Sequence, residues 1–218
     1  MSKILNLQLI NKSSILGNFC LFAKPKAMQG GKAVSVFPVA FLVAPVAPQE
    51  SHTFKWSNEK SFVFGQLPAH LEPGKEFVVE GLLKCKDNNH VTLDYNVDEQ
   101  QYKLKDLCVV DDTKVSSGEL CVHAANTIPS ASHVNVGLAV NQLPLCVTRV
   151  SKSDTNTHFS HDGATYYIAV GNMNEGEIIE PANLPSRAKF EFPKHTDTLF
   201  VTFDKDETFV FEKPKHRQ

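Results

Sequence analysis

Apolar and polar residues alternate strictly in many short segments of this chain. The clearest case is residues 91–98, in which every odd position is apolar and every even position is polar. Side chains of a β-strand point to opposite faces with a period of two, so such a segment places one face in a core and one in water. Large apolar or aromatic residues likewise occupy every second position in residues 5–9, 166–170 and 199–203.

Turn residues separate these segments, for example Pro73-Gly74 and residues 171–176. About a dozen strand candidates follow at spacings of roughly 8–16 residues, without a long segment of period 3.6. Residues 34–43 are apolar on both faces and predict a central strand covered on both sides, with a bulge at Pro38. The sequence therefore predicts an all-β protein, an antiparallel β-sandwich of about a dozen short strands.

The length of 218 residues suits one sandwich, and we expect a single domain over residues 1–212. The polar segment 111–118 predicts a long crossover inside it, with a boundary between two domains as the alternative. Residues 213–218 predict a flexible basic tail. A second polar segment, residues 151–163, has almost nothing to bury and predicts a loop.

Charge argues against nucleic-acid binding, and hydropathy argues against a membrane-spanning helix. The 22 Lys and Arg are spread among 24 Asp and Glu, giving a net charge of −2 and no basic field for nucleic acid. The longest apolar stretch, residues 34–47, is interrupted by Pro38 and Pro45 and is shorter than the ~20 residues of a membrane-spanning helix. The chain starts with a strand pattern rather than a signal peptide, so we expect a cytoplasmic protein unless a nonclassical route exports it.

The cysteines are expected to pack in the core rather than to bind a metal or to act in catalysis. Their number is odd, their spacing is wide, and no C-x-x-C pair occurs, which argues against zinc. We expect reduced, buried thiols in a reducing compartment. They are Cys20, Cys85, Cys108, Cys121 and Cys146.

The most metal-like string contains His158, His161 and Asp162. On a strand the two histidines would face opposite sides and could not chelate one ion, whereas in a loop they could. We expect a solvated polar loop here. Residues 204–207 could hold calcium, but they lack the Gly and distal Glu of an EF-hand loop, so a charged hairpin tip is expected.

Motifs of catalysis and cofactor binding are missing. The sequence has no G-x-S-x-G, no G-x-G-x-x-G and no G-x-x-x-x-G-K-[ST]. We therefore predict no catalytic, cofactor-binding or metal residues. Trp56 and the fifteen phenylalanines are expected to fill the core, with a ligand platform as the alternative.

A set of packing and turn residues extends along most of the chain: Leu5-x-Leu7-x-Leu9 with Asn11-x-Ser13, Phe22, Pro25, Phe41-Leu42-Val43, Phe54-x-Trp56, Phe62-Val63-Phe64-Gly65, Pro73-Gly74, Val136-Gly137-Leu138-Ala139-Val140, Tyr166-Tyr167-Ile168-Ala169-Val170-Gly171 and Gly176. In their order, these residues resemble those of rhizosphere-expressed RhiA-type proteins. The family is named for bacterial expression around plant roots under cell-density control. The resemblance implies a soluble accessory β-sandwich protein and assigns no activity, cofactor or site residue.

These observations favour a non-catalytic protein that acts by self-assembly or by binding, since sandwiches leave edge strands available for pairing. The alternative is a lectin-like or membrane-active module that meets a carbohydrate or lipid headgroup with the loop aromatics Phe159, Tyr166 and Tyr167. An enzyme is the least favoured class.

Overall fold

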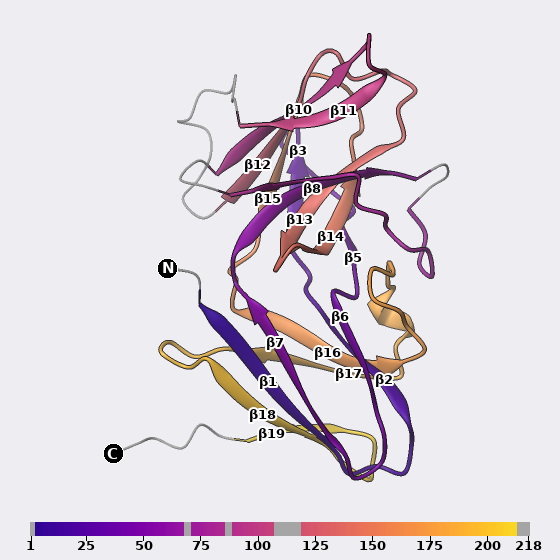
Figure 1. The fold of residues 1–218 in the computed structure, drawn as a ribbon, viewed down its shortest axis with the longest axis vertical. Helices are drawn as coiled ribbons and strands as arrows, with labels where there is room; N and C mark the ends of the chain where they lie inside the picture. The colour runs from indigo at the N-terminus through magenta and orange to yellow at the C-terminus, as the bar shows by residue number, and fades with distance from the viewer. Residues whose placement is uncertain (1–2, 68–70, 86–88, 107–118, 213–218) are drawn as a thin grey trace.

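The computed structural model describes residues 3–67, 71–85, 89–106 and 119–212, and it confirms the all-β fold (Figure 1). The described residues form nineteen strands and one short 3-10 helix, η2 (Pro181–Asn183), without an α-helix. The strands belong to four sheets. Within these residues, no helix has the length and hydropathy to cross a membrane.

Sheets A and B occupy one half of the long axis in Figure 1. Sheet A contains, in order, β19 (Phe209–Phe211), β18 (Thr198–Phe203), β1 (Ile4–Asn11) and β7 (Ser51–Ser57). Sheet B contains β17 (Ser186–Glu191), β16 (Thr165–Gly171), β2 (Gly17–Phe22) and β6 (Leu42–Val46). Their facing side chains form one hydrophobic cluster, and we call this pair the A/B sandwich.

Sheets C and D occupy the other half. Sheet C contains, in order, β11 (Gln101–Lys105), β10 (His90–Asn96), β12 (Glu119–Ala124), β15 (Thr155–Ser160), β3 (Lys26–Gln29) and β4 (Lys32–Val34). Sheet D contains β5 (Phe37–Pro38), β14 (Leu143–Arg149), β13 (Val134–Val140), β8 (Lys60–Gln66) and β9 (Gly81–Lys84). A second cluster fills the space between them, and we call this pair the C/D sandwich.

Most neighbouring strands are antiparallel, as predicted, but β1 pairs with β18 and β10 pairs with β12 in parallel. A hairpin cannot join parallel neighbours, so these pairs bring distant segments together. In sheet A, Leu7 of β1 lies beside Leu199 on one side and Phe54 on the other. The N-terminal strand is therefore central in its sheet.

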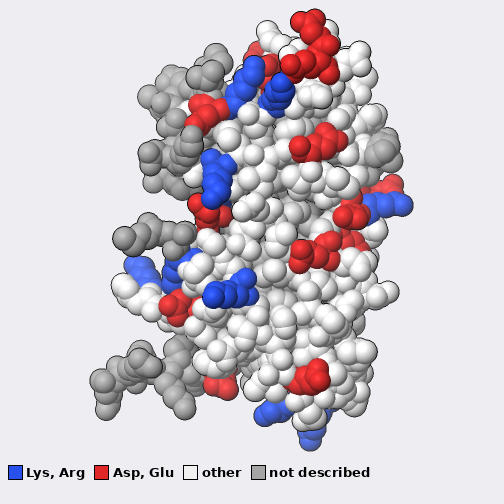
Figure 2. All heavy atoms as spheres, viewed as in Figure 1, with Lys and Arg blue, Asp and Glu red and all other residues white. Residues whose placement is uncertain are grey.

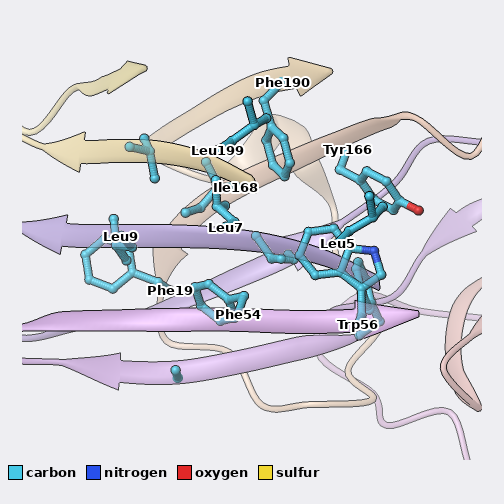
Figure 3. Packing of buried hydrophobic residues seen from close by; sticks show 14 of the residues in the cluster. Leu5, Leu7, Leu9, Phe19, Phe54, Trp56, Tyr166, Ile168, Phe190 and Leu199 are labelled. Carbon is cyan, nitrogen blue, oxygen red and sulfur yellow. The ribbon is translucent and has the colours of Figure 1, made fainter. Parts of the chain in front are cut away.

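The core of the A/B sandwich is rich in aromatic rings. Figure 3 shows Leu5, Leu7 and Leu9 of β1 among these rings. Trp56 is only 1% exposed and meets Tyr166 edge-on at 5.3 Å between ring centroids. The predicted core role of Trp56 is thus confirmed.

Hydrophobic clusters cover sheets B and D on both faces, whereas among the described residues none of them covers the outer faces of sheets A and C. Met173 and Ile179, from the segment after β16, cover the second face of sheet B. Phe77 and Ile178 similarly cover the second face of sheet D.

The chain passes between the two sandwiches at β2–β3, β5–β6, β7–β8 and β15–β16. Neither sandwich is built from one continuous segment. A single domain over residues 1–212 stays a prediction, and residues 111–118 and 213–218 lie outside the described part of the chain.

Two local predictions are wrong. Residues 34–43 are not one central strand, because β4, β5 and β6 follow each other here in sheets C, D and B. Pro38 has no N–H to donate, and β5 pairs over only two residues before the chain moves on. Residues 151–163 are not a loop throughout, since β15 lies within them; it buries Thr157 and Phe159, with polar types at several of its other positions.

Candidate functional site

The outer face of sheet C carries a row of sulfur and imidazole side chains that crosses four adjacent strands. Met28 of β3 pairs with His158 of β15, His158 pairs with Cys121 of β12, and Cys121 pairs with His90 of β10. Directly opposite residues in a sheet have Cβ atoms about 4.5–5.5 Å apart. We call Met28, His158, Cys121 and His90 the donor row.

Alternation places Cys121 on this outer face, because its neighbours Leu120 and Val122 point into the core of the C/D sandwich. Its Sγ lies 4.0 Å from Nε2 of His158, and Nδ1 of that ring lies 3.7 Å from Oε2 of Glu119. Cys121 is fully buried, whereas the His158 and Glu119 side chains are 22% and 31% exposed. The imidazole thus lies between a buried thiol and a partly exposed carboxylate.

A thiol, an imidazole and a carboxylate in this order also occur in nucleophilic enzymes. Here the thiol of Cys121 has no exposed surface. Its backbone N–H donates to the carbonyl of Asn89 at 2.7 Å, so it cannot stabilise an oxyanion. The arrangement favours binding over attack on a substrate.

A groove of about 390 Å³ runs along β3, β4 and β15 next to the donor row. Its apolar lining consists of Pro25, Ala27, Met28, Ala33, Val34 and Val36, and its polar lining of Lys26, Glu119, His158 and Ser160. Ligand sites are typically of this size, with mainly apolar walls and a few polar groups that fix orientation.

The histidines of the metal-like string are separated by the fold. His158 lies on the outer face of sheet C, whereas His161 is only 8% exposed and meets the ring of Tyr166 edge-on at 5.5 Å. Lys60 Nζ donates to the carbonyl oxygen of His161 at 2.8 Å, and His161 Nδ1 lies 3.8 Å from a carboxylate oxygen of Asp162. The solvated loop predicted for His161 is therefore wrong.

Burial, assisted by the positive charge of Lys60, lowers the pKa of His161 to about 4. Burial likewise lowers the pKa of Lys60. His161 Nε2 and the indole nitrogen of Trp56 are buried without a hydrogen-bond partner. His161 is thus a neutral ring inside the protein where β15 of sheet C leads into β16 of sheet B. Among the described residues, no three His, Cys, Asp or Glu side chains are arranged around one metal position.

Cys20, Cys85, Cys121 and Cys146 are free cysteines in the described part of the chain, and their reduced state stays a prediction. Three of them are buried, and Cys85 is half-buried. Burial raises the pKa of the Cys20, Cys85 and Cys146 thiols to about 12, so these three are poor nucleophiles. Cys108 lies outside the described residues.

The loop aromatics expected to bind a carbohydrate or lipid do not form a surface. Phe159 and Tyr166 lie in strands and are fully buried, because both face cluster cores. Tyr167 stacks on Phe22 at 5.1 Å, with Lys24 Nζ 5.2 Å from the centre of its ring.

The charged hairpin tip predicted for residues 204–207 is confirmed between β18 and β19. The carboxylate of Asp204 accepts hydrogen bonds from the backbone N–H groups of Asp206 and Thr208, both at 3.0 Å. These hydrogen bonds, above all those that Thr208 donates, lower the pKa of Asp204. The carboxylate therefore caps the turn.

Surface charge is mixed. Figure 2 shows Lys and Arg scattered among Asp and Glu on the visible face, with broad uncharged areas between them.

The sequence analysis singled out His158 but not the residues that the fold places beside it. Cys121 and His158 are separated by 37 positions, and His90 lies in another strand, before Cys121 in the chain. The available signal was weak: Cys121 stands between the apolar residues Leu120 and Val122, whereas His90 and His158 each have only one apolar neighbour in the sequence. Only strand order and register bring them together.

The described residues define an all-β protein of four packed sheets, with the donor row on the outer face of sheet C. The model of the RhiA family matches residues 3–213, so the chain belongs to the RhiA family, as its packing and turn residues predicted. No curated protein and no solved structure matches this chain.

Proposed function

We propose that this RhiA-family protein is a non-enzymatic binding protein whose ligand lies in the groove of sheet C beside His158. The supporting observation is the groove itself, in which Met28 and Val34 provide apolar wall and Glu119 and His158 provide polar groups. Such a lining suits a small molecule with an apolar body and one polar end.

A binding role agrees with the state of the thiols. Burial raises the pKa of three thiols to about 12, and the thiol of Cys121 is covered. Four cysteines without a disulfide also suit a reducing compartment, and we place the protein in the cytoplasm. The sugar- or lipid-binding alternative loses its support, because Phe159 and Tyr166 are buried.

The groove is tested with the uncharged dye Nile red, titrated with the full-length protein while its fluorescence is recorded. We expect saturable binding that Ala33→Trp weakens about tenfold or more, which corresponds to about 1.4 kcal/mol. Ala33 is exposed on β4 and lines the groove, so a large ring there fills it.

The matched control is Ala131→Trp, which places the same ring at an exposed alanine outside the groove lining. This variant is expected to bind the dye like the wild type. Equal affinity of the wild type and Ala33→Trp would show that the groove is not the site, and so would the absence of saturable binding.

A second candidate function is self-association through the outer face of sheet A. Four large apolar side chains are exposed there: Ile4 (43%), Ile10 (38%), Phe200 (43%) and Val210 (52%). The rest of this face within the strands consists of the neutral residues Asn6, Gln8, Ser51, Thr53, Ser57, Thr198 and Thr202 and the single charge of Lys55. A face almost without charge can pack against a second copy of itself without burying like charges.

Static light scattering of the wild type at increasing concentration tests this second function. The mean mass is expected to rise from that of a monomer towards that of a dimer. A constant monomer mass over the whole range would remove self-association while leaving the groove untouched.

A further inference from the structure

The side chains of the donor row are of types that bind metal ions, which an apolar ligand in the groove does not require. A thiol, a thioether and two imidazoles are all soft or borderline ligands, and they lie in adjacent strands on one face of sheet C. Thiolates and thioethers select soft ions such as copper(I), and imidazole also suits copper. Hard cations such as magnesium and calcium prefer oxygen ligands instead.

The spacing between Cys121 and His158 fits one ion between them. An ion midway along the 4.0 Å from Sγ to Nε2 would lie about 2 Å from each atom. Metal–nitrogen and metal–sulfur bonds in proteins are about 2.0–2.3 Å long. The two ligands would then lie on nearly opposite sides of the ion, which is the arrangement of low-coordinate soft ions.

Glu119 lies on the far side of the His158 ring from Cys121. Its Oε2 lies 3.7 Å from Nδ1 of that ring, whereas Nε2 is on the side of the Cys121 sulfur. A carboxylate behind a metal-binding histidine is a common second layer around metal sites.

Charge balance favours a monovalent ion. Binding replaces the S–H bond of Cys121 with a sulfur–metal bond and releases one proton to solvent, without a change of oxidation state. A thiolate and a monovalent cation leave the buried sulfur position neutral, and the carboxylate of Glu119 lies on the other side of the ring. Zinc also needs four ligands, and the described residues offer no group of three around one point.

We propose that Cys121 and His158 bind copper(I), with Glu119 as a positioning residue. Met28, the cross-strand partner of His158, is 44% exposed and provides the nearest thioether in the row for a third bond. The His158 side chain is 22% exposed, so an ion reaches the ring from solvent. This site goes beyond the proposed groove ligand, since neither needs the other to be present.

The test is a competition for copper(I) under anaerobic conditions between the full-length protein and bicinchoninate, followed by the absorbance of the copper–bicinchoninate complex. The wild type is expected to retain one equivalent of copper(I). Cys121→Ser and His158→Gln are expected to lose it, and Glu119→Gln to bind about tenfold more weakly. X-ray absorption of the loaded protein should show both sulfur and nitrogen neighbours of the ion.

Two controls make the result specific. Cys85→Ser removes a half-buried thiol outside the donor row and should retain the equivalent of copper. Ala33→Trp blocks the groove and should also retain it, which separates this site from the proposed ligand groove. His158→Gln changes a partly exposed side chain, so the test does not depend on Cys121→Ser folding.

Three results would overturn the proposal. The first is that the wild type loses all copper(I) to the competitor. The second is that His158→Gln, or folded Cys121→Ser, retains the equivalent. The third is that zinc displaces copper(I) from the wild type at equal concentration.

Discussion

The two sandwiches of this protein fill their cores with different side chains. The A/B core contains the aromatic residues Phe19, Phe41, Phe54, Trp56, Tyr166, Phe190, Phe192 and Phe203. The C/D core contains Phe62, Phe64 and Phe159 and otherwise mainly smaller aliphatic side chains. Aromatic pairs with edge-on geometry contribute about 0.5–1.5 kcal/mol beyond their buried area, so the A/B sandwich combines area with directional contacts.

The outer faces of sheets A and C differ in the side chains that they carry. The outer face of sheet A is nearly uncharged, whereas that of sheet C carries the donor row together with the ion pair between Asp94 and Lys105. The outer face that carries thiol, thioether and imidazole side chains therefore belongs to the sandwich whose core has fewer aromatic residues. We infer from this contrast that ligand binding belongs to the C/D sandwich and association to the A/B sandwich.

The largest expected effect tests whether the two sandwiches unfold together in one transition or independently. Phe62 is fully buried in the C/D core, and the single tryptophan, Trp56, reports on the A/B core. Phe62→Ala is expected to lower the free energy of unfolding by about 3–5 kcal/mol. Because the chain crosses between the sandwiches four times, the same shift should appear in Trp56 fluorescence and in far-UV circular dichroism during urea unfolding.

Val97→Ala, at an exposed position of the C/D sandwich, serves as the control and should shift neither signal by more than about 0.5 kcal/mol. An unchanged Trp56 transition in Phe62→Ala would mean that the two sandwiches unfold independently. The single-domain prediction would then be wrong.

The second effect concerns His161, near the passage from β15 to β16. Its pKa is about 4 in the folded protein and about 6.5 when unfolded, so the unfolded chain binds the proton first as the pH falls. Stability is fully present above about pH 6.5, declines as the pH falls towards about 4, and is constant with respect to this group below that. The shift corresponds to at most about 3 kcal/mol.

Urea unfolding between about pH 7 and about pH 4 measures this decline, which His161→Gln should largely remove. His158→Gln is the matched control and should keep it, because His161 is intact. Asp162 has a lowered pKa, since hydrogen bonds from Thr165 and Ala164 outweigh the effect of burial, and it titrates at the acid end of this range or below it. An equal decline in His161→Gln would assign the pH dependence to other groups.

The smallest effect concerns the open face of sheet A. Val210→Lys places a charge on this face and should weaken self-association about tenfold, or about 1.4 kcal/mol, in light scattering. Val97→Lys makes the same change at an exposed valine of the C/D sandwich and should leave association unchanged. Equal weakening by both variants would point to net charge rather than to this face.

The strands themselves were accessible from the sequence because alternation is a local property of the chain. Leu5, Leu7 and Leu9 are buried while Ile4, Gln8 and Ile10 are exposed, as their spacing requires. The alternation was less visible in β15, where Thr155 and Thr157 occupy buried positions. Polar residue types at inward positions explain why this strand was missed.

By itself, the sequence determined that the chain forms strands, which faces of them are buried in most cases, and that its family is RhiA. Only the tertiary structure decided that β4, β5 and β6 join three different sheets and that β12 lies between β10 and β15. Local side-chain periodicity fixes which way a residue points, but strand order and register depend on contacts between distant segments. The meeting of Cys121 with His158 depends on that order and register.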